Sequence, residues 1–183
     1  MADKKELRKL LRSRRQQYAE LQAEYSKRVM EQLMQHPRFL AAETVMLYHA
    51  LPDEVDTQSI LQGFYQQKQL LLPVIDGDTM FPVCYTGEDN LHAGSYNINE
   101  PQGAPFTRLS SIDLVIAPGM AFDTAGRRMG RGKGYYDRFL SKFEGNIVGI
   151  CYSECVQRSL PHGRFDRPVE LLVTESYLRR TVR

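Results

Sequence analysis

The sequence predicts an α/β protein: a single three-layer domain in which a mainly parallel open sheet carries helices on both faces. Two observations predict this fold. Short segments that are apolar throughout recur along the chain, and segments with helical periodicity alternate with them. Continuous apolar strands are typical of a parallel sheet, because helices cover both of its faces. A length of 183 residues, 42% of them hydrophobic, fits one domain over residues 1–183.

The first predicted element is a long amphipathic helix over residues 4 to about 35, with a break near Tyr18. Its apolar side chains recur at spacings of three and four: Leu7, Leu10, Leu11, Tyr18, Leu21, Tyr25, Val29 and Leu33. The start of this helix is strongly basic, and we expect its cations on the exposed face: Lys4, Lys5, Arg8, Lys9, Arg12, Arg14 and Arg15. Such a segment fits a transit peptide, a nucleic-acid arm, a membrane-surface helix or part of an anion site. Its acidic residues argue against a transit peptide.

Six strands and two further helices are expected after this helix. The strands are apolar and rich in β-branched residues, at 44–49, 70–75, 81–85, 114–117, 147–152 and 171–174. Asp56 and Thr57 can cap a helix that runs through Gln67, and a second helix is expected over 134–143. The long connection from Thr86 to Ser111, rich in Gly, Asn and Pro, is expected to line a site.

The most informative motif follows the strand at 114–117. Gly130, Gly132 and Gly134 stand at alternate positions, which lets backbone N–H groups converge on an anion. A helix that opens near Gly134 would point its positive end at the same place. Four cations accompany the glycines: Arg127, Arg128, Arg131 and Lys133. A basic surface turn before a helix explains less of this pattern, so we predict a polyphosphate site.

This loop differs from two common phosphate-binding motifs. A Walker A loop needs a hydroxyl residue after its Gly-Lys pair, whereas Gly134 follows Lys133 here. A dinucleotide fingerprint needs the spacing Gly-x-Gly-x-x-Gly, so NAD is disfavoured. If Mg²⁺ accompanies the phosphates, Asp137 is suited to supply a carboxylate oxygen, because it lies one helical turn after Gly134.

The sequence shows no feature of a membrane or secreted protein. No apolar run approaches the length of a membrane span and no signal-peptide core is present, so we expect a cytoplasmic protein without a membrane partner. Cys84, Cys151 and Cys155 lack metal-ligand spacing and are expected to be buried thiols. A nucleophilic cysteine is the alternative, although no histidine lies near these positions in sequence.

Five motifs, in order along the chain, carry a resemblance to a known family. They are the N-terminal Lys-x-x-x-Arg, the run from Asp53 to Thr57, the turn Ile98-x-Glu100-Pro101, the segment Pro118-Gly119-x-Ala-Phe-Asp123 and the loop from Gly130 to Asp137. Together they resemble the 5-formyltetrahydrofolate cyclo-ligases, also called methenyltetrahydrofolate synthetases, over nearly the whole chain. The resemblance implies ATP- and Mg²⁺-dependent conversion of 5-formyltetrahydrofolate to 5,10-methenyltetrahydrofolate, with release of ADP and phosphate. It further implies phosphorylation of the formyl oxygen and attack by folate nitrogen 10.

The resemblance also implies which residues bind ATP. Lys4 and Arg8 match an N-terminal basic pair that contacts nucleotide phosphates, with ordinary solvated helix charges, the usual role of terminal cations, as the alternative. The other implied ATP-binding residues form the loop: Arg128, Gly130, Arg131, Gly132, Lys133, Gly134, Tyr135 and Tyr136. Residues 131–135 also border the folate in this resemblance, and Arg131, Lys133 and Tyr135 are the catalytic candidates.

Folate and metal ligands are implied in the same way. Glu54 matches a pterin-binding glutamate, with a plain turn acid as the alternative, and His49 lies at a neighbouring substrate position. Asp137 and Asp166 match Mg²⁺ carboxylates, although Asp166 also suits a turn cap. The chain departs from the family pattern at two positions, where Tyr96 replaces a common tryptophan and Glu170 a common aspartate.

Two other functions compete with this interpretation. A nucleic-acid-binding module would use the basic helix and loop, but the net charge of +2 and the lack of interleaved aromatic residues disfavour it. A sugar-phosphate isomerase would need neither Mg²⁺ nor so many cations. We therefore expect only small-molecule substrates, no nucleic acid, and a monomer.

Overall fold

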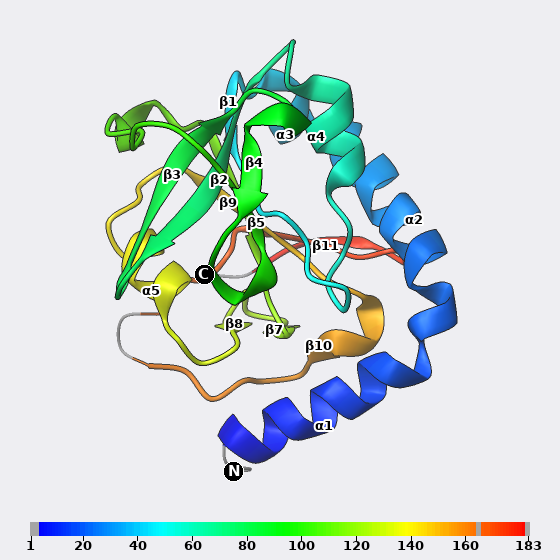
Figure 1. Ribbon diagram of the computed structural model, residues 1–183. Coiled ribbons are helices and arrows are strands. Elements are labelled where there is room, and N and C mark those ends of the chain that lie inside the picture. The colour runs from blue at the N-terminus through cyan, green and yellow to red at the C-terminus, as the bar shows by residue number, and fades with distance from the viewer. Residues whose placement is uncertain (1–3, 164–165, 182–183) are drawn as a thin grey trace.

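The computed structural model describes residues 4–163 and 166–181, and a seven-stranded sheet forms its centre (Figure 1). The strand order is β12-β11-β9-β6-β1-β2-β3. The five inner strands pair in parallel, and the edge strands β3 and β12 pair antiparallel with their neighbours. The strands are β1 (Thr44–Met46), β2 (Gln69–Asp76), β3 (Thr79–Tyr85), β6 (Leu114–Pro118), β9 (Asn146–Ile150), β11 (Leu171–Val173) and β12 (Leu178–Arg180).

Helices lie on both sides of this sheet. Figure 1 shows α2, α3 and α4 on one side and α5 on the other, which confirms the predicted three-layer α/β class. The helices are α1 (Lys4–Gln17), α2 (Gln22–Met34), α3 (Pro37–Ala41), α4 (Gln58–Phe64) and α5 (Tyr135–Leu140). Short 3-10 turns also occur in the described residues: η1 (Ala19–Leu21) joins α1 to α2, and the others lie in connections between strands, namely η2 (Glu88–Asn90), η3 (Ser95–Asn97), η4 (Leu109–Ser111) and η5 (Ser153–Cys155).

The break expected near Tyr18 is present. α1 ends at Gln17, and the η1 turn separates it from α2. Val29 and Leu33 of α2 are buried as expected, because they face the sheet. Leu10 and Leu21 were expected on the apolar face but are 49% and 40% exposed. The helix direction changes at η1, so one apolar stripe does not continue across the break.

Two small sheets, the edge strand β12 and α3 were not predicted. β7 (Ala121–Asp123) lies between β8 (Arg128–Met129) and β10 (Val156–Gln157), and β4 (Leu91–Ala93) pairs with β5 (Asn99–Pro101). These elements have two to five residues, which is too short for a periodic pattern to emerge. Their positions matter, because β7 and β8 hold the glycine-rich loop and the β4–β5 hairpin lies in the long connection expected to line a site.

The core is continuous across the inner strands. Phe122 is fully buried, and a side chain at Gly119 would meet its ring at 2.7 Å, so glycine is needed there. Cys151 and Cys155 are buried thiols as expected, whereas Cys84 is partly exposed because it lies on the edge strand β3. None of the helices within residues 4–163 and 166–181 has both the length and the apolar character that a membrane span needs.

Candidate functional site

A cavity of about 340 Å³ lies at the carboxyl ends of the parallel strands. This is the end of an open α/β sheet at which ligands bind. The residues that follow β1 and β6, His49 and Gly119, form part of its wall. Ten of the predicted site residues line it together: His49, Glu54, Arg128, Gly130, Arg131, Lys133, Gly134, Tyr135, Tyr136 and Asp137.

The glycine-rich loop forms one side of this cavity. β8 anchors its start, since the backbone N–H of Met120 donates to the carbonyl of Met129 at 2.8 Å. Gly134 has a φ of +73°, in the left-handed region that glycine adopts without strain, and α5 begins at the next residue. The predicted helix start near Gly134 is therefore confirmed, although α5 ends three residues before the predicted end at 143.

Arg128 lies at the base of the loop with two partners. Its guanidinium forms an ion pair with Asp137, and it also lies 5.4 Å from the centre of the Tyr136 ring. Burial raises the pKa of Tyr136 well above its ordinary value, so this phenol stays neutral. The buried Nε of Arg128 and hydroxyl of Tyr136 have no hydrogen-bond partner within the described residues. Buried polar atoms without partners are costly, so this wall is suited to a ligand with polar atoms.

Arg131 joins the loop to the turn that carries Glu54. Its Nε donates to Oε1 of Glu54 at 3.1 Å, and its Nη2 forms an ion pair with Asp53. The other oxygen of Glu54 accepts from the backbone N–H of Leu51 at 3.2 Å. Burial would raise the pKa of Asp53, but the hydrogen bond and the charges of Arg131 and Arg15 lower it overall. The Asp53 carboxylate is therefore held ionised.

Apolar side chains and a neutral histidine complete the opposite wall. Burial lowers the pKa of His49 against the opposing charges of Asp56 and Glu88, so His49 is neutral at pH 7. The sequence interpretation missed most of the apolar lining: Tyr48, Leu51, Pro73, Ile75, Met80, Ile98, Pro118 and Met120. Three of these were anticipated in part: Ile98 lies in the connection that was expected to line a site, and Pro118 and Met120 lie in the motif segment that follows the strand at 114–117.

The N-terminal cations do not line the cavity. Arg8 lies behind the loop, where its Nε donates to the carbonyl of Gly130 at 3.0 Å. Its guanidinium also lies 3.5–3.7 Å from the position that a Cβ atom would occupy at Gly132. Lys4 lies one turn earlier on α1 and is partly buried. The expectation that all cations of this helix face solvent is wrong for Arg15, which is 2% exposed.

The predicted metal ligands are placed differently. Asp137 lies on the cavity wall beside Arg128. The Asp166 carboxylate accepts from the backbone N–H of Gly163 at 2.7 Å, and Asp166 is not among the described residues that line the cavity. The described residues contain no group of three or more metal-ligating side chains. The shared site for both aspartates stays a prediction.

The two departures from the family pattern have separate outcomes. The Tyr96 side chain lies outside the described part of the structure. Glu170 has a structural role, because it accepts from the backbone N–H of Ile147 at 2.6 Å and lies near Arg38 and Arg167.

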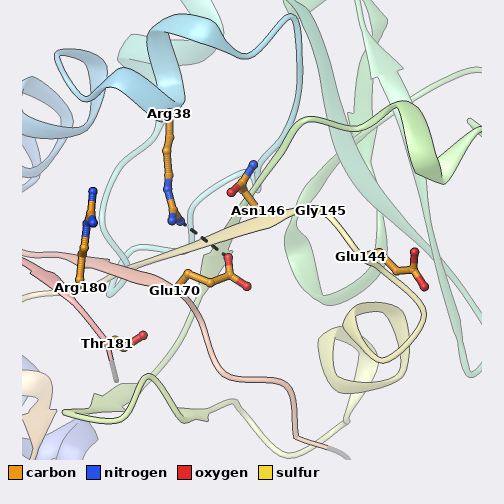
Figure 2. A pocket seen from close by; sticks show the side chains of 7 residues that line it. All are labelled: Arg38, Glu144, Gly145, Asn146, Glu170, Arg180 and Thr181. Carbon is orange, nitrogen blue, oxygen red and sulfur yellow. Dashed lines mark ion pairs between the residues drawn. The ribbon is translucent and has the colours of Figure 1, made fainter. Parts of the chain in front are cut away.

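A second hollow, of about 460 Å³, lies at the opposite, amino ends of β9 and β11 (Figure 2). Figure 2 shows Arg38 pointing toward Glu170, with 3.7 Å between their charged groups. Its other lining residues are Glu144, Gly145, Asn146, Arg180 and Thr181. Acidic and basic side chains are mixed here, so this hollow does not concentrate charge of one sign.

Known proteins of one family match this chain over most of its length. The model of the 5-formyltetrahydrofolate cyclo-ligase family matches residues 1–175. The 5-formyltetrahydrofolate cyclo-ligase of Escherichia coli K12 is 29% identical over 178 residues, which cover 91% of this chain and 97% of that protein.

Solved structures agree with this match. The NMR structure of the Aquifex aeolicus 5,10-methenyltetrahydrofolate synthetase is 34% identical with a TM-score of 0.84, and the alignment covers 97% of this chain and 92% of that one. A synthetase from Mycoplasma pneumoniae, 20% identical with a TM-score of 0.73 over 95% of this chain and 99% of its own, supports the fold alone. With the family model matching nearly the full length, the chain belongs to the 5-formyltetrahydrofolate cyclo-ligase family of enzymes.

Proposed function

We propose that this enzyme converts 5-formyltetrahydrofolate to 5,10-methenyltetrahydrofolate with the consumption of ATP in the presence of Mg²⁺. One observation carries the proposal: a single cavity joins a carboxylate beside apolar walls to a glycine-rich loop with three cations. Glu54 lies on one side, and Arg128, Arg131 and Lys133 lie on the other. The two sides match the two substrates. Folate has a flat ring with N–H donors, which suits a carboxylate beside apolar walls, and ATP has a polyphosphate, which suits a cationic loop.

The pterin ring fits the side of the cavity around Glu54. A carboxylate with two oxygens can accept from two neighbouring N–H donors of the ring. Ile75, Met80 and Ile98 supply apolar surface for the ring faces. The Arg131 Nε donates to Oε1 of Glu54, so ring donors that bind this oxygen would replace it there. Arg131 is then available to the reacting groups.

The triphosphate fits the loop side. The unpartnered Arg128 Nε and Tyr136 hydroxyl are donors that phosphate oxygens can satisfy. Lys133 adds a point charge on the same wall, and the glycines allow close approach of the backbone. Arg8 holds the loop from behind, since it donates to the carbonyl of Gly130. We propose that Lys4, Arg8, Arg128 and residues 130 to 136 together bind ATP.

The chemistry needs activation of a poor leaving group. The oxygen of a formamide does not leave readily, so transfer of the γ-phosphoryl group to it gives an imidate-like phosphate. Folate nitrogen 10 then attacks the formyl carbon, the ring closes and phosphate leaves. We propose that Arg131, Lys133 and Tyr135 stabilise the charge on the transferring phosphoryl oxygens and hold the formyl oxygen in line.

Asp137 is the carboxylate that fits a Mg²⁺ ion in this cavity. Mg²⁺ needs only one or two carboxylates when phosphate oxygens and waters complete its six positions, and it neutralises phosphate charge when bound. Asp137 lies on the wall and is 40% exposed at its side chain, which leaves it open to the cavity. Asp166 remains a proposed second ligand.

The remaining parts of the proposal concern partners and location. The proposed partners are the two small-molecule substrates alone, and the enzyme is proposed to be a cytoplasmic monomer. A relative from Arabidopsis thaliana that is 30% identical over 189 residues is named as mitochondrial.

The test is a spectroscopic assay. Purified protein is mixed with 5-formyltetrahydrofolate, Mg²⁺ and ATP, and the near-ultraviolet absorbance of the methenyl product is followed while ADP is measured. One ADP per product molecule is expected, with no product when ATP is omitted. Product formed at the same rate without ATP would contradict the phosphorylation step, and absence of product would contradict the function.

A further inference from the structure

Arg15 is a buried cation for which the proposed reaction does not account. It lies near the end of α1, and only 2% of its surface is exposed, whereas its neighbours Arg12 and Arg14 are exposed. A buried guanidinium is costly unless its N–H donors find acceptors. Its contacts therefore indicate why the fold retains it.

The donors of Arg15 reach three segments that are far apart in sequence. Its Nη1 donates to the carbonyl of Asp53 at 2.8 Å and approaches the Asp53 carboxylate at 3.4 Å. Its Nη2 donates to the carbonyl of Gly119 at 2.7 Å, and its Nε to Sγ of Cys155 at 3.4 Å. Burial alone would lower the pKa of Arg15, but the groups around it raise it overall, so Arg15 stays charged.

Two of these acceptors lie at or directly beside lining residues of the substrate cavity. Asp53 directly precedes Glu54, and its carboxylate lies between Arg15 and Arg131. Gly119 is itself a wall residue, at the end of β6. Arg15 contacts both from behind the wall and does not line the cavity.

We propose that Arg15 is a positioning residue, which holds the Asp53–Glu54 turn and the Pro118–Gly119 segment together so that Glu54 presents its carboxylate to folate. This inference rests on the proposed function. The planar guanidinium suits the task, because its donors diverge in a fixed fork. A lysine at this position would carry the charge but could not reach the three segments with the same geometry.

The test is a double-mutant cycle on folate binding. The dissociation constant for 5-formyltetrahydrofolate is measured by calorimetry for wild type, Arg15→Met, Glu54→Gln and the double variant, with Arg14→Met as the matched exposed control. Arg15→Met is expected to weaken binding about tenfold in the wild-type background and by less than about twofold when Glu54 is already replaced. Arg15→Lys should fall between wild type and Arg15→Met, and Arg14→Met should match wild type.

Each outcome decides between the two claims. If the effects of Arg15→Met and Glu54→Gln simply multiply, Arg15 does not act through Glu54 and the inference is wrong. If wild type does not bind 5-formyltetrahydrofolate, the proposed function is wrong as well. Circular dichroism and thermal unfolding establish that each variant is folded. If Arg15→Met does not fold, the same cycle with Arg15→Lys decides the question, because it retains the buried charge.

Discussion

The two hollows of this molecule differ in chemistry more than in size. The hollow at the amino ends of the strands is the larger, at about 460 Å³ against about 340 Å³. Its acids and bases are intermixed, as Glu170 lies between Arg38 and Arg167. The cavity at the carboxyl ends instead collects cations on the loop, carboxylates on the facing turn and apolar side chains between them.

This difference has a topological cause. In a parallel sheet the loops that leave the carboxyl ends of the strands converge, so residues from β1, β6 and the glycine-rich loop meet there. Arg131 and Glu54 form a pair 77 positions apart in sequence. Within the described residues, the amino-end hollow leaves one buried nitrogen without a hydrogen bond, Nη1 of Arg38, which lies 3.7 Å from the Glu170 carboxylate. The carboxyl-end cavity leaves two such atoms, Nε of Arg128 and the hydroxyl of Tyr136. The carboxyl-end cavity is the better candidate site, because its cations gather on one loop, whereas those of the amino-end hollow are mixed with acidic side chains.

Among the variants that test this comparison, Lys133→Ala is expected to have the largest effect, and the effect should fall on turnover. The substitution removes the positive charge that is proposed to stabilise the transferring phosphoryl group. Loss of one stabilising group of this kind typically lowers turnover by about 100-fold or more. Steady-state assays at saturating ATP measure the loss, and folate binding should change little. The matched control is Lys142→Ala, an exposed lysine just after α5. Wild-type turnover in Lys133→Ala would mean that the loop does not act on phosphate.

Glu54→Gln should have the next largest effect, and it should fall on folate. The amide offers one acceptor and an N–H₂ donor where the pterin edge needs two acceptors, a mismatch of about 1–3 kcal/mol in binding. Titration with 5-formyltetrahydrofolate measures the loss, while the affinity for ATP should stay close to that of wild type. Glu144→Gln, in the other hollow, is the control. Unchanged folate affinity in Glu54→Gln would mean that Glu54 does not bind the pterin ring and has only a structural role in the turn.

Asp137→Asn should change the metal requirement more than the maximal rate. The amide is a weaker Mg²⁺ ligand than the carboxylate, so the Mg²⁺ concentration for half-maximal activity should rise several-fold. Asp166→Asn should raise it less, if its contact with the metal runs through water. Activity is measured over a Mg²⁺ series at fixed ATP. Identical Mg²⁺ curves for Asp137→Asn and wild type would remove Asp137 from the metal site.

Arg180→Ala should have the smallest effect of the four. Arg180 lines the hollow at the amino ends and is exposed, so its loss leaves the carboxyl-end cavity untouched. Turnover and both substrate affinities should match those of wild type, and the unfolding temperature should change little. A marked loss of activity in this variant would show that the two ends of the sheet are coupled.

The local pattern of the chain was enough to predict the main elements and the loop. The order of apolar strands, the break near Tyr18 and the helix start after Gly134 were all confirmed. Boundaries differed where tertiary contacts decide them. The strand predicted at 44–49 ends at Met46, although the next residue still donates from its backbone to Leu71.

The sequence by itself determined the fold class and the position of the glycine-rich loop, because apolar periodicity and glycine spacing are local properties. Only the tertiary structure decided which charges meet. Periodicity places Arg15 on a helix, but its burial depends on Asp53, Gly119 and Cys155 from distant segments. Arg8 behind the loop likewise depends on how α1 packs. Electrostatic energy depends on distance in space and on burial, and neither is a local property of the chain.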